Sequence, residues 1–184
     1  VLFLILAFVN AAGLFILMGA FAHHAQVGKR LFHVANKWVG HLPGGLAMAS
    51  ILTSAGFAAT SGSSVATAAT VGAVAIPEMK AKGYDARLAA GAVAAGGVLG
   101  VLIPPSVLLI FYAALTEVSA GKMLIAGFVP GILTTIAFMI GVAVIGHRVQ
   151  DRATRAPRAS WGERARATTQ AWQVLVLFVI VLGG

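Results

Sequence analysis

Cysteine is absent from these 184 residues, and acidic residues are scarce, with five Asp and Glu against 13 Lys and Arg. Without cysteine, this chain forms no disulfide, no thiolate metal site and no cysteine nucleophile. Only 10% of the residues are charged whereas 59% are hydrophobic, and the mean hydropathy is +0.94. Soluble domains are far more polar, so the composition is typical of an integral membrane protein.

The net charge of +8 would by itself suit a nucleic-acid partner. The basic residues, however, lie in short polar stretches between apolar segments, which is the distribution that the positive-inside rule describes. We therefore expect the lipid bilayer as a partner, and no nucleic acid.

Apolar runs and their interruptions divide the chain into seven predicted segments. They are a span (1–27), a basic amphipathic helix at the membrane surface (28–43), a re-entrant hairpin (44–79), a broken span (86–117), a span (120–146), a cytoplasmic loop (147–171) and a truncated span (172–184). The last run is too short to cross a bilayer, so we expect the chain to be incomplete. The predicted fold class is an all-α, multi-span membrane protein.

The hairpin prediction rests on the polar stretch Thr60-Ser61-Gly62-Ser63-Ser64, which has apolar sequence on both sides. A spanning helix needs about 20 apolar residues. The 34 residues from Gly44 to Pro77 leave arms of only about 13 to 16 residues, or roughly 20 to 24 Å of helix, with Pro77 and Glu78 closing the second arm. Such arms are expected to enter the membrane, turn inside it and return.

Charge bias leads to the same topology. The Arg-rich stretch 148–166 is the most basic and is expected in the cytoplasm. Counting spans backwards then places the turn at 80–87 in the cytoplasm, and the basic residues of 28–43 belong there too. Residues 44–79 must therefore enter and leave on one side.

A second irregular element is predicted at Pro104-Pro105, inside the apolar region 86–117. Proline lacks the N–H of a helical hydrogen bond, and it disfavours helical geometry in the residue before it. The region should therefore form two half-helices, from Ala86 to about Leu102 and from about Ser106 to Leu115. Asp85 is a plausible N-cap of the first.

Polar, non-helical backbone at membrane depth is tolerated only where it is buried or lines a wet cavity. Carbonyl and hydroxyl oxygens suit a small hard cation, and helix N-termini attract anions. Paired discontinuous helices are typical of secondary transporters. The candidate ion and substrate site comprises Ser61, Gly62, Ser63, Ser64, Thr67, Gly97, Gly100, Pro104, Pro105 and Ser106, with Ser61, Ser63, Ser64, Gly97 and Gly100 as the candidate Na⁺ ligands.

Two other classes stay open on the residues alone. An intramembrane serine hydrolase using Ser63 would need a base at the same depth, and no histidine is predicted there. A passive channel or assembly subunit would need neither an ion site nor catalysis. We expect no enzyme activity, no catalytic residue and no cofactor besides Na⁺ as the coupling ion.

Four motifs occur in a fixed order along the chain. They are Gly40-His41-Leu42-Pro43-Gly44-Gly45-Leu46, Gly56-Phe57 with Ser61-Gly62-Ser63-Ser64-Val65-Ala66-Thr67, Ile76-Pro77-Glu78-Met79 with Gly83-Tyr84-Asp85, and Gly100-Val101-Leu102-Ile103-Pro104-Pro105-Ser106. From about residue 14 onwards the chain resembles the large membrane subunit of tripartite ATP-independent periplasmic (TRAP) transporters. Many family members have an acidic residue where Thr67 stands, so this chain offers a hydroxyl without a charge there.

The resemblance implies one half of an inverted-repeat, elevator-type permease in the bacterial inner membrane. Such a permease imports organic anions, such as C4-dicarboxylates, keto acids or sialic acids, by symport with sodium. It works with a small membrane subunit and with a periplasmic substrate-binding protein. The first repeat is the part that the chain resembles.

Overall fold

The structure is a computed structural model that describes residues 9–10, 13–14, 17–22, 24–149, 159–170 and 172, without the side chains of 147–149 and 170. Within these residues every regular element is an α-helix. The predicted truncated span, apart from Trp172, lies outside the described residues. So do most of the first half of the predicted span 1–27 and residues 150–158 and 171 of the predicted loop.

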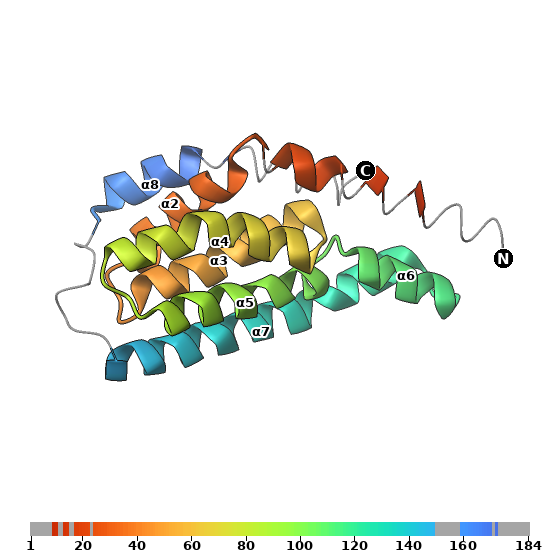
Figure 1. The fold of residues 1–184 in the computed structure, drawn as a ribbon. Coiled ribbons are helices and arrows are strands. Elements are labelled where there is room, and N and C mark those ends of the chain that lie inside the picture. The colour runs from red at the N-terminus through yellow and green to blue at the C-terminus, as the bar shows by residue number, and fades with distance from the viewer. Residues whose placement is uncertain are drawn as a thin grey trace.

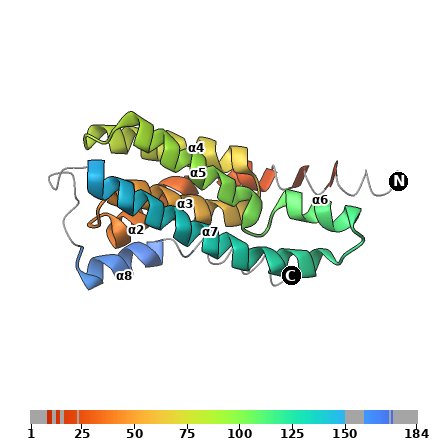
Figure 2. The same ribbon diagram turned by 90° about the horizontal axis from the view of Figure 1, so that it is seen from below.

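Four helices run side by side and form the body of the molecule, as Figure 1 shows. They are α3 (Gly45–Ser61), α4 (Ser64–Ala81), α5 (Ala86–Leu102) and α7 (Ala120–Val149). The short helix α6 (Val107–Leu115) continues beyond one end of this body. At the other end, α2 (Val27–Val39) and α8 (Trp161–Gln170) pack against each other (Figure 2).

Helix α3 lies at the centre and is buried over most of its length. Its alanines, glycines and serines allow neighbouring backbones to approach closely, as in membrane helix bundles. Larger apolar side chains fill the remaining space, and several are fully buried, including Ile51, Phe57, Val71, Met79 and Leu99. The predicted hairpin arms thus form the core of the described part of the protein.

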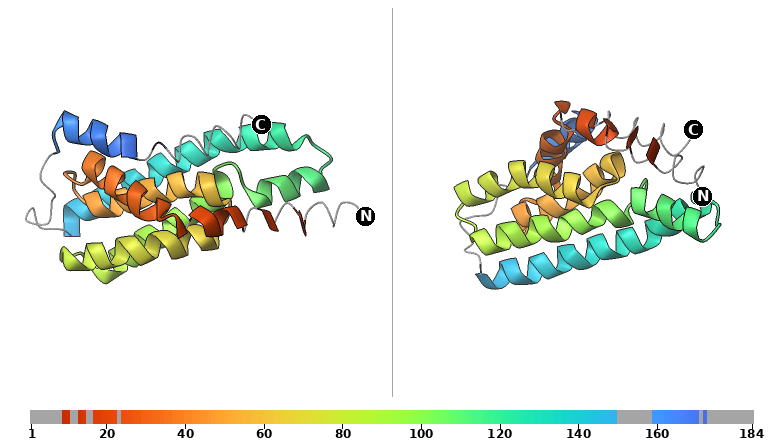
Figure 3. Two further views of the ribbon diagram at one scale, coloured as in Figure 1. Left: turned by 90° about the horizontal axis from the view of Figure 1, so that it is seen from above. Right: turned by 45° about the vertical axis from the view of Figure 1, so that its right-hand side comes forward.

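The apolar surface fits a bilayer. Residues 120–146 of α7 are long and apolar enough to cross a membrane, with a mean hydropathy of 2.3, and α5 with α6 passes the same test as a pair bent by 41°. Large apolar side chains such as Leu108, Ile125 and Ile136 are exposed on α6 and α7, which extend along one side of the molecule (Figure 3). The described part is therefore an all-α membrane protein, as predicted.

Two boundaries differ from the predictions. Pro77 was expected to close the second arm, but α4 continues through it to Ala81. A proline inside a helix removes one N–H, here the partner of the Ala73 carbonyl, and membrane helices accommodate such a loss.

The second difference is α8, which forms within the stretch predicted as a hydrophilic loop. Its first turn is a capping box. Glu163 N–H donates to Ser160 Oγ at 3.3 Å, and Ser160 N–H donates to the Glu163 carboxylate at 3.0 Å. By contrast, the predicted N-cap of α5 is confirmed, since Asp85 accepts a bond from Arg87 N–H at 2.7 Å.

Tyr84 connects the start of α3 to the turn between α4 and α5 through a hydrogen bond. Its ring is buried, and its hydroxyl accepts a hydrogen bond from Leu46 N–H at 3.1 Å. Leu46 lies in the first turn of α3, where backbone N–H groups have no partner within the helix.

We predict that Tyr84→Phe destabilises the folded protein by about 1 kcal/mol, because Leu46 N–H loses its buried partner. Thermal unfolding of the detergent-solubilised full-length protein measures the effect. Tyr112→Phe is the matched control, because Tyr112 is 55% exposed. Equal melting temperatures for the two variants would contradict the prediction.

Candidate functional site

The predicted polar tip is a sharp turn between two helices. Helix α3 ends at Ser61, and Gly62 adopts φ +60°, a left-handed conformation that favours glycine. Its N–H donates to the Ala58 carbonyl at 2.9 Å. Ser63 then caps α4, because its hydroxyl accepts a bond from Ala66 N–H at 3.3 Å.

Thr67 ties this turn together from inside. Its hydroxyl donates to the Ser63 carbonyl at 2.7 Å and lies 3.0 Å from Ser61 Oγ. A hydroxyl has one proton, so Ser61 must be the donor in the second contact. Thr67 is therefore fully buried and stabilises the tip through these two hydrogen bonds. In the second bond Ser61 donates its hydroxyl proton and does not use its lone pairs.

The predicted helix break is also present. Helix α5 ends at Leu102 and α6 begins at Val107, with Pro104 and Pro105 fully buried between them. Because neither proline has an N–H, the carbonyls of Gly100 and Val101, four residues earlier, lack their helical donors. The break thus leaves carbonyl oxygens open to other partners.

The tip and the break touch each other. Val107 N–H donates to the Gly62 carbonyl at 3.4 Å. A Cβ on Gly100 would lie 2.6 Å from the Ser63 carbonyl oxygen, so only glycine fits there, and one on Gly97 would lie 3.4 Å from the Ser64 carbonyl oxygen. We call this contact region the tip–break junction. It brings the two predicted segments, 61–67 and 97–106, into contact through Gly62, Ser63 and Ser64 on one side and Gly97, Gly100 and Val107 on the other.

Four helix ends meet at the tip–break junction. Helices α3 and α5 end there, while α4 and α6 begin there. A helix end carries roughly half a unit charge, negative at the C-terminus and positive at the N-terminus. The junction therefore offers partial charges of both signs, one pair suited to a cation and the other to an anion.

Ser106 has a buried hydroxyl without a protein partner. It is fully buried and stands at the N-cap position of α6, yet its Oγ makes no capping bond. In α3, by contrast, Ser50, Thr53 and Thr60 donate to carbonyls of their own helix. A buried polar atom without a partner destabilises the fold unless something binds it. The Ser106 oxygen is thus available to a further partner.

Sequence reasoning missed residues that support the junction from outside. On α7, a Cβ on Gly127 would lie 3.0 Å from the Leu102 carbonyl oxygen, and one on Gly131 would lie 2.9 Å from the Ile103 side chain. These two glycines form a Gly-x-x-x-Gly motif, the usual pattern for close helix packing in membranes. This motif is visible in the sequence, so the close packing of α7 could have been predicted from it. Ser54, a buried hydroxyl in α3 with no partner, was also missed.

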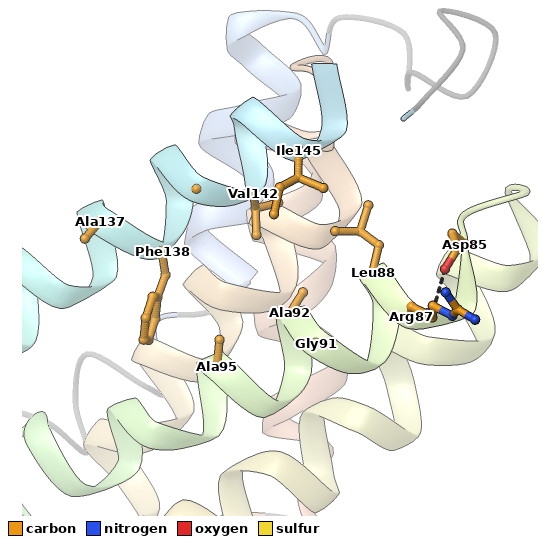
Figure 4. Close-up of a pocket in the computed structure, with 11 residues that line it drawn as sticks. Asp85, Arg87, Leu88, Gly91, Ala92, Ala95, Ala137, Phe138, Val142 and Ile145 are labelled. Atoms are coloured by element: carbon orange, nitrogen blue, oxygen red, sulfur yellow. Dashed lines mark hydrogen bonds between the residues drawn. The ribbon is translucent and has the colours of Figure 1, made fainter. Parts of the chain in front are cut away.

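An apolar groove of about 600 Å³ lies elsewhere, between α5 and α7. Figure 4 shows Phe138 and Val142 on one wall and Ala92 and Ala95 on the other, with Arg87 at one end. None of the ten predicted site residues lines it. Since its walls are mostly apolar, it has no set of convergent oxygens for an ion, and the tip–break junction remains the candidate site.

Comparison with known proteins shows the family. Residues 5–184 match the family model of the tripartite ATP-independent periplasmic transporter, DctM component. The chain belongs to this family. It is thus a TRAP large-permease sequence, and the predicted resemblance is confirmed. The family consists of transport proteins, so the chain is not an enzyme and the serine hydrolase alternative falls.

Individual TRAP relatives differ in the substrate that their names give. The C4-dicarboxylate large permease of Pseudomonas aeruginosa is 45% identical over 92% of this chain and 39% of its own length. The isethionate permease DctMQ of Oleidesulfovibrio alaskensis is 42% identical over 71% of this chain and 21% of its own length. The sialic acid permease SiaT of Haemophilus influenzae is 31% identical over 95% of this chain and 28% of its own length. The chain therefore spans less than half the length of these relatives.

We predict that Gly100→Ala separates the tip from the break, because the added Cβ would meet the Ser63 backbone. Overpacking of this kind costs about 1 to 3 kcal/mol. The full-length TRAP permease should melt at a lower temperature and transport more slowly. Gly91→Ala, in the same helix, is the matched control because a Cβ there meets nothing within 4 Å. Two variants with equal melting temperature and transport rate would refute the close approach.

Proposed function

We propose that this chain forms half of a sodium-coupled TRAP permease that imports small organic anions. The observation that carries the proposal is the tip–break junction, where two interrupted helices bring four helix ends and several buried oxygens together. In this proposal residues 44–79 dip into the membrane from the cytoplasm and return, so the junction lies at membrane depth.

The oxygens at the junction fit Na⁺, which travels as cargo. Hydroxyls of Ser61 and Ser106 and the open carbonyl of Gly100 are hard ligands without net charge, beside the negative ends of α3 and α5. Ser63 and Ser64 are half-buried at the same place and complete the hydroxyl set. Gly97 serves differently, because its carbonyl lies inside α5 and its missing side chain is what admits the tip.

The anion would bind beside the starts of α4 and α6. Backbone N–H groups in the first turn of a helix point outward and attract carboxylates. The relatives named above are called permeases for C4-dicarboxylate, isethionate and sialic acid, and each of these compounds carries a carboxylate or sulfonate. A bound Na⁺ would offset the charge of such a group, so that the loaded carrier can move through the membrane.

The other components of the transporter would come from the rest of the protein and from partner proteins. We propose an elevator movement of the hairpin with α5 and α6, in a multi-pass protein of the bacterial inner membrane. A periplasmic binding protein would deliver the substrate, and a small membrane subunit would hold the complex. One relative carries the name DctMQ, which is consistent with a large and a small subunit in one chain.

Uptake by the full-length permease in liposomes, with its small subunit and binding protein, tests the proposal. Labelled C4-dicarboxylate and sialic acid should accumulate only when an inward Na⁺ gradient is present. Flux without any ion gradient would support a passive channel instead, and uptake that depends on ATP would exclude a secondary transporter.

We predict that Ser106→Ala raises the Na⁺ concentration for half-maximal uptake by about 5-fold, the equivalent of one lost ligand of about 1 kcal/mol. This hydroxyl has no protein partner, so its removal should leave the fold intact. Ser50→Ala is the control, because that hydroxyl bonds to the Ala47 carbonyl at 2.8 Å within α3. An unchanged Na⁺ dependence in Ser106→Ala would remove Ser106 from the ion site.

A further inference from the structure

A basic pocket of about 620 Å³ lies between α2 and α8, outside the proposed transport site. One wall is a stripe of α2 formed by Gln26, Lys29, Arg30 and His33, which recur at intervals of three and four residues and so share one face. The other wall comes from Thr169 and Trp172. The described residues that line the pocket include no acidic side chain.

The two helices are joined firmly beside this pocket. Trp38 Nε1–H donates to Thr168 Oγ1 at 3.2 Å, and the rings of Trp38 and Trp161 meet edge to face, 6.3 Å apart. The Arg164 guanidinium lies over both rings, 5.7 and 5.4 Å from their centroids. Cation–π and aromatic contacts of this kind hold α8 against α2, so the pocket is part of the fold.

The residue pattern of α2 is that of a helix at the membrane surface. Its apolar side, with Val27, Phe32 and Ala35, is buried in the body of the molecule, and its basic side is exposed. Tryptophan side chains gather at the depth of lipid headgroups in membrane proteins. Trp38 on α2, Trp161 on α8 and Trp172, two residues after the end of α8, are all exposed.

We propose that this pocket binds the phosphodiester headgroup of an anionic phospholipid such as phosphatidylglycerol. Lys29, Arg30 and the imidazole of His33 supply donors for the phosphate oxygens. Lys29 also lines a neighbouring cleft whose walls include Glu78, so Lys29 has a carboxylate in the cleft next to the pocket. The exposed indole of Trp172 gives the pocket an apolar edge, which suits the start of an acyl chain and not a free phosphate ion.

The proposal depends on the location of the chain in a membrane and not on sodium coupling. Full-length protein in detergent would be titrated with phosphatidylglycerol, with phosphatidylcholine and with inorganic phosphate, and bound lipid counted by native mass spectrometry. The double variant Lys29→Gln with Arg30→Gln should bind phosphatidylglycerol at least roughly tenfold more weakly. The matched control, Lys80→Gln with Lys82→Gln, removes the same charge from an exposed turn and should bind as the parent does.

Each outcome has a definite reading. Equal weakening in both double variants would mean general attraction to anionic surfaces and would overturn the proposed pocket. Competition by inorganic phosphate at concentrations similar to that of the lipid would overturn the lipid assignment. A charge-preserving exchange, Lys29→Arg with Arg30→Lys, should retain binding, so it separates lost charge from a damaged fold. Failure of that variant to bind while it remains folded would contradict a phosphate contact based on charge.

Discussion

The backbone contact between the hairpin tip and the broken helix is the feature on which the rest of the molecule depends. Val107 N–H meets the Gly62 carbonyl, and Gly100 lies against the Ser63 backbone. Neither segment can satisfy its own backbone, because one turns sharply and the other contains two prolines. The tip supplies one of the missing partners, since the Gly62 carbonyl accepts from Val107 N–H in the first turn of α6. The helices α3, α4 and α5 that carry the two segments form much of the buried core.

The buried hydroxyl groups differ in whether they have hydrogen-bond partners. Most of those in α3 are turned back onto their own helix, which makes them compatible with an apolar interior. At the junction Thr67 donates to the Ser63 carbonyl, while the Ser106 hydroxyl, like that of Ser54 in α3, has no partner in the described part of the protein. A protein that only needed to pack these helices would gain by replacing Ser106 with an apolar residue. The open hydroxyl of Ser106 is therefore the part of the junction on which the proposed ion site rests most directly.

Much of this arrangement could be predicted from the sequence, because it follows from local chemistry. The polar stretch around Gly62 and the double proline at 104–105 predict the two helix interruptions, and the structure has both. The course of α4 through Pro77 could not be predicted, because tertiary packing decides whether a helix survives a proline. Helix α8 was within reach, since Ser160 and Glu163 have the spacing of a capping box. The partnerless state of Ser106 depends on distances that no pattern of residues contains.

The most direct test of the central claim is the depth of the tip in the bilayer. Nitroxide labels at Val65, beside the tip, and at Lys80, near the far end of α4, are both on exposed positions and are separated by roughly 22 Å of helix. Electron paramagnetic resonance in the full-length protein would compare their collision rates with a water-soluble nickel chelate. A label at 65 that meets the chelate far less often than one at 80 is the predicted result. Equal, high rates at both positions would mean that α4 crosses the membrane completely, and that the tip and the break do not meet within it.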